Sequence, residues 1–197
     1  MAKRLFDLIV SMLGLIALLP IFIVLSIWIR LDSKGSVFFR QTRIGLNGKP
    51  FKIHKFRTMY VDSEKKGQLT IGRDVRITRI GHYLRKYKID ELPQLIDVFI
   101  GRMSIVGPRP EVDEFMSEYS NDVRQKILSV RPGITDLASI EMVDENEIIG
   151  KYPDPHRAYI DIIMPIKEKY YLDYVRNNNL ILDIKIIFLT LKKIVFR

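Results

Sequence analysis

The chain has 197 residues, 47% of them hydrophobic, which is enough for one compact domain with an appended element but not for two full domains. Its 32 Lys and Arg outnumber 23 Asp and Glu, and the net charge of +9 favours an anionic partner such as nucleic acid, anionic lipid or a phosphorylated substrate. The sequence contains no cysteine, which excludes disulfide frameworks, thiolate zinc sites and cysteine nucleophiles.

The first element is apolar. No charged residue occurs from Leu8 to Ile29, and a helix of that length reaches roughly 33 Å, the scale of a membrane. A cleaved signal peptide is the alternative, but the segment is long and lacks a convincing small-residue cleavage site. Basic residues flank both ends, so the charge rule assigns no orientation.

Pro20 lies near the middle of this segment. It lacks a backbone N–H and its ring presses on the preceding turn, so the sequence predicts a kink. We therefore expect residues 1–34 to form a re-entrant membrane helix with both ends on the cytoplasmic side, and residues 35–197 to form a cytoplasmic domain. A kinked helix that spans the membrane is the alternative, because spanning helices tolerate proline.

Two short strands are predicted around Asn47-Gly48, a dipeptide favoured in β-hairpins. Period-two alternation in the second strand places Lys55 and Arg57 on one face, after two apolar anchors. The simpler interpretation of these two cations is a solvated strand end.

A basic segment follows a polar stretch, Asp62 to Thr70, which is predicted to be a mobile loop. The cations of this segment are Arg73, Arg76, Arg79, Arg85, Lys86 and Lys88. They form an electropositive wall in front of two adjacent carboxylates, Asp90 and Glu91.

An amphipathic helix is predicted directly after the two carboxylates. Its apolar positions are Leu92, Leu95, Ile96, Phe99 and Ile100. Because Pro93 is tolerated only in the first helical turn, the helix should begin close to Asp90. An acid there also caps the helix and stabilises it by about 0.3 to 1 kcal/mol, which is the alternative to a chemical role.

Arg109 lies between Pro108 and Pro110, both of which fix φ, so its guanidinium extends from a stiff backbone. Rigid presentation of this kind suits an anion clamp. The Arg-Pro pairing occurs again at Arg131 in "VRPGIT".

The C-terminal segment predicts a basic amphipathic helix that lies in a membrane surface. Its apolar stripe consists of Leu180, Ile184, Ile187, Phe188, Leu191 and Val195. Core packing is the alternative, since an apolar stripe alone does not distinguish the two. The expected fold class is α+β and mainly helical, with a Pro-broken re-entrant helix, a small β-hairpin and interfacial amphipathic helices around the active site.

Carboxylates, arginines and a membrane helix are what remain once common motifs are excluded, because the sequence has no G-x-S-x-G, Walker A or G-x-G-x-x-G motif. An aspartate with a reference pKa of about 3.9 is ionised at neutral pH and can act as a nucleophile without a helper base. Arginine forks and Mg²⁺ would offset its repulsion of an anionic phosphate, since both bind phosphate oxygens.

The order of several blocks resembles the bacterial sugar transferases, the monotopic polyprenyl-phosphate phosphoglycosyl transferases. The blocks are "FFRQTRIG", "FKIHKFRTM", "KIDELPQLIDVFIGRMSIVGPRP", "VRPGIT" and "LILDIKIIFLTLKKI", and they cover nearly the whole chain. The resemblance implies that Asp90 is a nucleophile that attacks the sugar-linked phosphate of a nucleotide-diphosphate sugar, such as a UDP-sugar, and passes the phosphosugar to undecaprenyl phosphate. Glu91 is implied to be its partner carboxylate, and both acids are implied to bind Mg²⁺.

The resemblance further implies phosphate or nucleotide contacts for Lys55, Arg57, Arg85, Arg109 and Arg131. It implies a place on the cytoplasmic face of the bacterial inner membrane, where glycan assembly begins. Membrane lipid is an expected partner and nucleic acid is not, while a homodimer is left open.

Two departures from the family pattern matter. Many relatives have Ser-Pro in the membrane helix where this chain has Leu19-Pro20, so a re-entrant geometry depends on Pro20 alone. Many relatives continue "PGITGWAQ" where this chain reads "PGITDLASI", which leaves open whether that loop recognises nucleotide or sugar.

Two other classes of protein make different predictions. A nucleic-acid module predicts steeply salt-dependent binding, but the sequence has no recognition-helix motif or aromatic RNA-binding signature. A membrane-associated adaptor predicts that Asp90→Asn leaves function intact.

Overall fold

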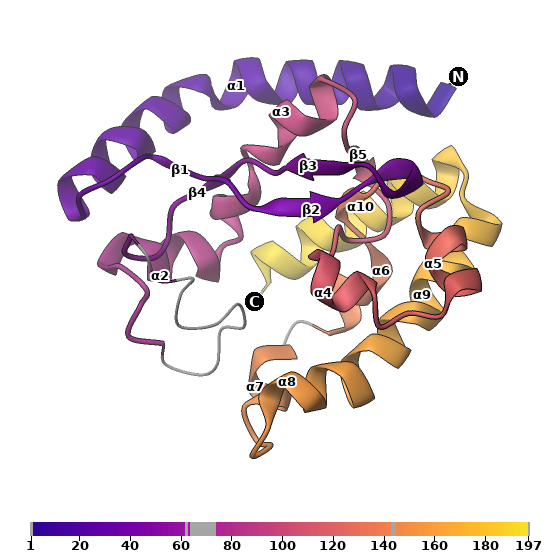
Figure 1. The fold of residues 1–197 in the computed structure, drawn as a ribbon. Helices are drawn as coiled ribbons and strands as arrows, with labels where there is room; N and C mark the ends of the chain where they lie inside the picture. The colour runs from indigo at the N-terminus through magenta and orange to yellow at the C-terminus, as the bar shows by residue number, and fades with distance from the viewer. Residues whose placement is uncertain (1, 62, 64–73, 143–144, 197) are drawn as a thin grey trace.

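The structure is a computed structural model that describes residues 2–61, 63, 74–142 and 145–196 (Figure 1). Arg73 and the predicted loop from Asp62 to Thr70, apart from Ser63, lie outside the described residues. Within the described ranges the chain is mainly helical with three two-stranded sheets, so the α+β, mainly helical fold class is confirmed.

Helix α1 runs from Ala2 to Asp32 and contains Pro20 without ending there. Figure 1 shows it lying along one side of the molecule and bending towards its C-terminal end. It is the one helix in the described part of the chain that is long and apolar enough to cross a membrane, which is compatible with membrane association. Most of its apolar side chains are exposed, Ile16 and Leu19 among them.

The start of α1 is bonded to the rest of the domain. Lys3 Nζ bonds Asp183 Oδ2 of α10 (Leu180–Val195) at 2.5 Å. The buried Asp7 carboxylate accepts a hydrogen bond from the Ser104 hydroxyl at 3.1 Å. The first turns of the apolar helix are thereby fixed against the central strands and the C-terminal helix.

The end of α1 is bonded to the same domain. The Asp32 carboxylate accepts from the N–H of Ile80 at the start of α2 (Arg79–Lys86), at 3.2 Å. The Arg57 guanidinium donates to the carbonyl of Ser33 at 2.7 Å, which satisfies one of the carbonyls left open where the helix ends. Both ends of α1 are therefore held by one folded unit.

The predicted hairpin is confirmed. Strand β2 (Thr42–Ile44) pairs antiparallel with β3 (Pro50–Lys52), and the 3-10 turn η1 (Leu46–Gly48) joins them. Asn47 has φ of 56° and Gly48 has φ of 75°, the left-handed conformations that Asn and Gly adopt most readily. The adjoining strands β1 (Phe38–Phe39) and β4 (Lys55–Phe56) pair in a second antiparallel sheet.

The strand pattern is interrupted between β3 and β4. His54 donates from its backbone N–H to Asp97 Oδ2 at 2.8 Å, and its Nδ1 lies 2.9 Å from Asp97 Oδ1. These two bonds replace the strand ladder, so the predicted alternation does not continue from Phe51 to Arg57. Lys55 and Arg57 follow this interruption, and their side chains bond different partners, Glu91 and the end of α1 respectively.

The middle of the molecule contains a parallel pair, β5 (Ser104–Val106) and β6 (Gly133–Thr135). A Cβ added at Gly133 would lie 2.1 Å from the backbone N of Gly107, so the two chain segments meet at a distance that only glycine allows. Helices precede and follow this pair: α2 (Arg79–Lys86), η3 (Ile89–Glu91), α3 (Gln94–Phe99), α4 (Asp113–Met116), α5 (Asn121–Ile127), α6 (Leu137–Glu141), α7 (Glu145–Ile149), α8 (Pro155–Ala158), the π-helical turn η4 (Tyr159–Ile163), α9 (Met164–Asn177) and α10 (Leu180–Val195).

Three clusters of buried apolar side chains hold these elements together. The largest joins α4, α5, η4 and α9 around Phe115 and Tyr171. A second joins α3, β5 and α10 around Val98 and Ile186. The third lies under the second half of α1, around Ile29.

Helix α10 is confirmed, and most of its predicted apolar stripe faces outward. Ile184 and Phe188 are 51% and 67% exposed, and Leu191 is also exposed, whereas Ile186 is fully buried against the core. The side chain of Val195 lies outside the described set. Core packing therefore applies to the Ile186 side of the helix and leaves the Phe188 side as an apolar surface.

Candidate active site

Asp90 and Glu91 lie in the 3-10 turn η3, ahead of α3, which begins at Gln94. The predicted helix therefore starts one turn later than expected. Lys88, just before the turn, has φ of 56°, which reverses the chain after α2. Both carboxylates are only 8% exposed.

The Glu91 carboxylate is clamped by two cations. Lys55 Nζ donates to Oε1 at 2.8 Å, and Arg109 binds both oxygens through its two terminal nitrogens, one of them at 3.0 Å from Oε2. Burial acts to raise the pKa of Glu91, but the charges of Arg109 and Lys55 outweigh it and hold that pKa well below its usual range. Glu91 is therefore a fixed, ionised carboxylate.

The Asp90 carboxylate is different. Among the described residues, no group donates a hydrogen bond to it and no cation forms an ion pair with it. Burial and then the negative charge of Glu91 raise its pKa, against weaker opposing effects of Lys55 and Arg85. Its oxygens therefore lack the fixed hydrogen bonds that hold the Glu91 carboxylate.

The fold places Lys55 at Glu91 through the interruption described above. Asp97 of α3 is fully buried and fixes His54, so the next residue, Lys55 of β4, points towards η3. The same helix that follows the acid pair thus sets the position of the lysine that binds it.

Arg109 reaches the site from the loop after β5. The N–H of Gly107 donates to the carbonyl of Thr135 at 3.1 Å, and the N–H of Gly133 donates to the carbonyl of Pro108 at 2.9 Å. The loop is thereby attached to β6 on one side. These bonds add to the restriction of φ by Pro108 and Pro110 on either side of Arg109.

Arg85 of α2 also belongs to the site. Its Nε donates to the Thr58 hydroxyl at 2.8 Å, and its positive charge lowers the pKa of Asp90, although burial and Glu91 still keep that pKa raised. The structure therefore brings together five of the predicted site residues: Lys55, Arg85, Asp90, Glu91 and Arg109.

The structure does not bring the other two predicted contacts to the acid pair. Arg57 caps the end of α1. Arg131 donates from Nε to the carbonyl of Gly101 at 3.0 Å and lines a separate cavity of about 300 Å³ beside Lys3 and Arg4. A motif shows which arginines occur together in sequence, and the three-dimensional fold decides which of them meet.

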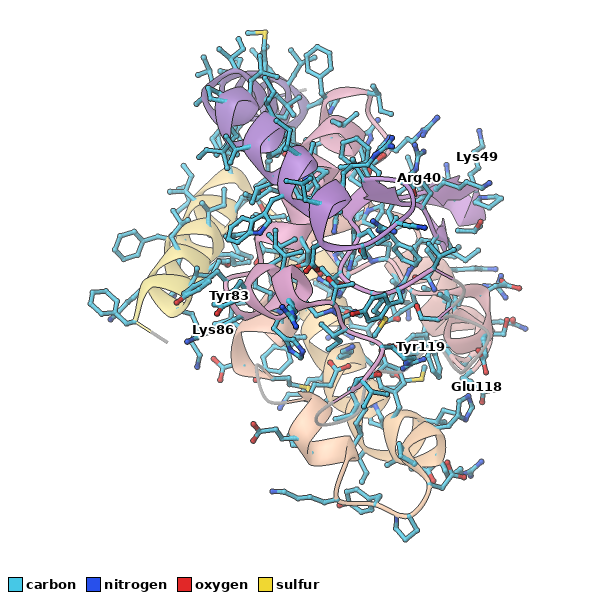
Figure 2. The ribbon with its side chains drawn as sticks, turned by 90° about the vertical axis from the view of Figure 1, so that its left-hand side faces the viewer. Arg40, Lys49, Tyr83, Lys86, Glu118 and Tyr119 are labelled. Carbon is cyan, nitrogen blue, oxygen red and sulfur yellow. The ribbon has the colours of Figure 1, made fainter. Side chains whose placement is uncertain are left out.

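The predicted electropositive wall is not continuous in the described residues. Arg76 pairs with its neighbour Asp74 at 2.6 Å. Arg79, Lys86 and Lys88 are exposed, and Figure 2 shows Lys86 on the outside of α2 near Tyr83. Arg85 and Lys88 are the described members of this segment whose charges act to lower the pKa of Asp90.

Sequence reasoning missed several buried groups near the site. Arg43 of β2 donates to the Pro110 carbonyl at 3.1 Å, and Glu111 is buried two positions after Arg109. An acid placed directly after a stiff Pro-Arg-Pro segment was the available signal for Glu111. The Arg43 side chain has no local signal, because its partner lies on a distant loop.

The departure at "PGITD" has a local structural explanation. The Asp136 carboxylate accepts from the backbone N–H of Ser139 at 2.9 Å and from its hydroxyl at 2.6 Å, which caps the start of α6. Burial raises the pKa of Asp136. The nearby Arg109 opposes this shift, so Asp136 also lies close to the active site.

A magnesium site is compatible with this chemistry. Within the described ranges there is no group of three or more acidic or histidine side chains that could bind a metal without help. Mg²⁺ in phosphate-handling sites usually takes one or two carboxylates together with phosphate oxygens and waters. Asp90, whose oxygens have no donor among the described residues, fits that smaller donor set, and Glu91 would join it by exchanging a contact with Lys55 or Arg109.

An open carboxylate framed by lysine and arginine, in a domain with a long apolar helix, is the arrangement expected of a protein that handles phosphate-bearing ligands at a membrane. The family model described as bacterial sugar transferase matches residues 1–197. The chain belongs to this family.

Curated relatives agree with this assignment. The chain is 40% identical over 195 residues to a UDP-glucose:undecaprenyl-phosphate glucose-1-phosphate transferase of Klebsiella pneumoniae, a match that covers 97% of this chain and 39% of the relative. It is 40% identical over 206 residues to an undecaprenyl-phosphate glucose phosphotransferase of Komagataeibacter xylinus, which covers 98% of this chain and 36% of the relative. A shorter relative, the exopolysaccharide production protein PSS of Rhizobium leguminosarum bv. phaseoli, is 37% identical over 198 residues, with 94% and 91% of the two chains covered.

The chain spans less than two fifths of the length of the first two relatives. It spans nearly all of the third. Because each match covers at least 94% of this chain, the segment shared with the relatives includes α1 and the acid pair.

Proposed function

We propose that the chain transfers a phosphosugar from a nucleotide-diphosphate sugar, of the UDP-sugar class, to undecaprenyl phosphate. The relatives' names support the substrate classes. The observation that carries the mechanism is the contrast between Glu91, held by two cations, and Asp90, whose carboxylate no described residue engages. The product would open the assembly of a bacterial glycan such as exopolysaccharide.

In the first step an Asp90 oxygen attacks the phosphorus that carries the sugar. The bond from that phosphorus to the bridging oxygen of the diphosphate breaks, and nucleoside monophosphate leaves with the electron pair. The product is a phosphosugar bonded to Asp90. No base is needed, because an ionised carboxylate is already the nucleophile.

In the second step a phosphate oxygen of undecaprenyl phosphate attacks the same phosphorus. The bond between phosphorus and Asp90 breaks, which restores the carboxylate and releases an undecaprenyl diphosphate-linked sugar. The lipid thus takes the group that the nucleotide donated, and the enzyme is unchanged.

The cations at the site supply electrostatic stabilisation of the phosphate oxygens, the main requirement of phosphoryl transfer. Arg109 and Lys55 already lie against Glu91 and are placed to turn to an incoming phosphate, while Arg85 acts from the α2 side. Bound Mg²⁺, held by Asp90 and Glu91, would supply further neutralisation of the diphosphate charge. Glu91 keeps Arg109 and Lys55 oriented between the two steps.

We place the chain on the cytoplasmic face of the inner membrane, with α1 re-entering the leaflet from which it came. The contacts at Lys3 and Arg57 support this, because one folded domain holds both ends of α1. A helix that spanned the membrane would carry its ends to surfaces roughly 30 Å apart. The exposed Phe188 side of α10 supplies an apolar surface that would lie in the interface.

An exchange experiment tests the covalent step. Purified protein is incubated with UDP-sugar, Mg²⁺ and isotopically labelled UMP, without undecaprenyl phosphate. The mechanism predicts that label enters the UDP-sugar, because the first step reverses when UMP attacks the phosphosugar on Asp90. Asp90→Asn is the matched control and should show no exchange; exchange that persists in this variant, or that requires the lipid, rejects the proposal.

A further inference from the structure

The loop that carries Arg109 is attached to more than the parallel strand pair. On its other side, Arg43 Nη1 donates to the Pro110 carbonyl at 3.1 Å. The backbone N–H of Ile44 donates to the carbonyl of Glu111 at 3.0 Å. The segment from Gly107 to Glu111 is therefore held between β6 and β2.

The side chain of Glu111 adds a third attachment, to helix α9. Its Oε1 accepts from the Tyr159 hydroxyl at 2.9 Å and lies 3.5 Å from Lys167 Nζ. Arg43 lies 3.8 Å from the other oxygen. Burial acts to raise the pKa of Glu111, but Lys167 and Arg43 outweigh it and lower that pKa, so the carboxylate is ionised.

Lys167 is itself buried and fully engaged. Its Nζ donates to the Tyr159 hydroxyl at 2.8 Å, pairs with Glu145 at 2.9 Å and lies 4.7 Å from the centre of the Tyr159 ring. Burial acts to lower the pKa of Lys167, but its neighbours, with Glu111 foremost, raise it above its usual value. Lys167, Glu111 and Tyr159 thus form one buried polar cluster behind the Arg109 loop.

A buried ion pair of this kind is a poor source of stability, because desolvation of the charges offsets their attraction. The surroundings add to the cost. The hydroxyls of Tyr119, labelled in Figure 2, and Tyr171 are buried without a hydrogen-bond partner in the described part of the chain, and the charge of Glu111 acts on both. Polar groups retained at such a cost indicate a requirement for geometry.

We propose that Lys167 and Glu111 are positioning residues that hold Arg109 in register with the acid pair. The inference rests on the proposed function, since it concerns the guanidinium that would stabilise the transferred phosphate. Tyr159 links the pair from the π-helical turn η4, a type of helix irregularity that is frequent at functional sites. Among the described residues, removing Lys167 would leave Glu111 with Arg43 as its nearest cation, and removing Glu111 would leave Lys167 paired with Glu145 alone, so either change would shift the loop.

The test compares kinetics in two backgrounds. Lys167→Met is made in the wild-type chain and in Arg109→Lys, and UMP release with UDP-sugar and undecaprenyl phosphate gives kcat and KM. In the wild-type background we expect kcat to fall about 10 to 100-fold and the KM for UDP-sugar to rise up to about 10-fold, since small misplacement of a group that binds the diphosphate is costly. In the Arg109→Lys background, Lys167→Met should lower kcat by less than about 2-fold, because the first substitution has already removed the guanidinium that Lys167 helps to position.

Two further variants make the result specific. Lys167→Arg should restore most of the loss, because it returns the buried positive charge. Lys126→Met removes a lysine from an exposed pair with Asp122 and should leave kcat unchanged. Equal losses from Lys167→Met in both backgrounds, or losses that track only the folded fraction, overturn the proposal.

Tyr159→Phe covers the case in which Lys167→Met does not fold. It removes one hydroxyl that joins Lys167 to Glu111 and keeps the ring. We expect a fall in kcat of about 3 to 10-fold in the wild-type background and none in Arg109→Lys. An unchanged kcat overturns the inference.

Affinity for UDP, measured calorimetrically on the same proteins, separates this inference from the proposed function. It should fall about 10-fold in Lys167→Met and change little when that substitution is added to Arg109→Lys. A wild-type chain that binds UDP with this coupling but shows no turnover would refute the proposed function and retain the positioning role. A wild-type chain that turns over but shows no such coupling would refute the positioning role and retain the proposed function.

Discussion

Two buried, charged regions of the molecule differ in how completely their groups are paired. Under the start of α1, Asp7 accepts from the Ser104 hydroxyl, and Lys3 bonds Asp183. In the acid pair, Glu91 is held just as firmly, but Asp90 beside it has no donor within the described ranges. Fully paired charges fix the fold, and the unpaired carboxylate is the group left free to react.

The largest effect is expected from Asp90→Asn. An amide oxygen is a poor nucleophile, so turnover should fall by about 10⁴-fold or more, as is typical when a nucleophile is removed. Steady-state UMP release measures this. Turnover within tenfold of the wild type would show that Asp90 is not the reacting group.

Arg109→Ala should lower kcat by about 10² to 10³-fold, because it removes a guanidinium aimed at the developing phosphate charge. Glu91→Gln should lower it by a smaller factor, since Lys55 and Arg109 lose their shared anchor but stay present. Steady-state kinetics on both variants, with circular dichroism to confirm folding, provide the comparison. Unaltered kinetics in either variant would remove that residue from the site.

Substitution in the region under the start of α1, where Asp7 is fully paired, should lower stability and leave kcat unchanged. Asp7→Ala leaves the Ser104 hydroxyl and the Ile105 N–H without their acceptor, and should destabilise the protein by about 2 kcal/mol. The kcat of the folded fraction should stay within about 2-fold of the wild type. Thermal unfolding in detergent and the same turnover assay measure the two quantities; a loss of kcat in fully folded protein would show that the two regions are not separate.

The smallest effect concerns pH. Burial and Glu91 raise the pKa of Asp90, so its ionised form destabilises the fold, and this penalty is absent below the unfolded pKa of about 3.9 and grows as pH rises above it. Asp90→Asn should therefore be more stable than the wild type at pH 7, by about 1 kcal/mol. Melting temperatures from pH 7 towards pH 4 should converge, and a gap that widens on acidification would contradict the stated cause.

The pKa shift of Glu91 has the opposite sign to that of Asp90. Because Arg109 and Lys55 hold its pKa below the usual range, its stabilising contribution is complete above the unfolded pKa and disappears as pH falls through the folded one. Glu91→Gln should therefore be less stable than the wild type at pH 7, and the difference should shrink in acid. The two neighbouring carboxylates thus give melting curves that respond to pH in opposite directions.

Local patterns were sufficient for several elements. The charge-free run predicted α1, the Asn47-Gly48 dipeptide predicted the β2–β3 hairpin, and the apolar stripe predicted α10. Each of these signals depends on residues close together in sequence. The adjacency of Asp90 and Glu91 is local in the same way.

Long-range contacts could not be predicted from local patterns. Alternation placed Lys55 and Arg57 on one face, but it could not show that Lys55 binds Glu91 while Arg57 binds the end of α1. The pairing of Lys167 with Glu111 likewise joins α9 to a loop far away in sequence. Such contacts are set by the packing of whole elements.

The different roles of Asp90 and Glu91 are tested most directly by peptide mass spectrometry of protein quenched after incubation with UDP-sugar and Mg²⁺, without lipid acceptor. The account predicts that the peptide containing Asp90 gains the mass of a phosphosugar and loses it when undecaprenyl phosphate is added. An unmodified Asp90 in protein that turns over once the lipid is supplied, or a modification on Glu91 instead, would contradict it.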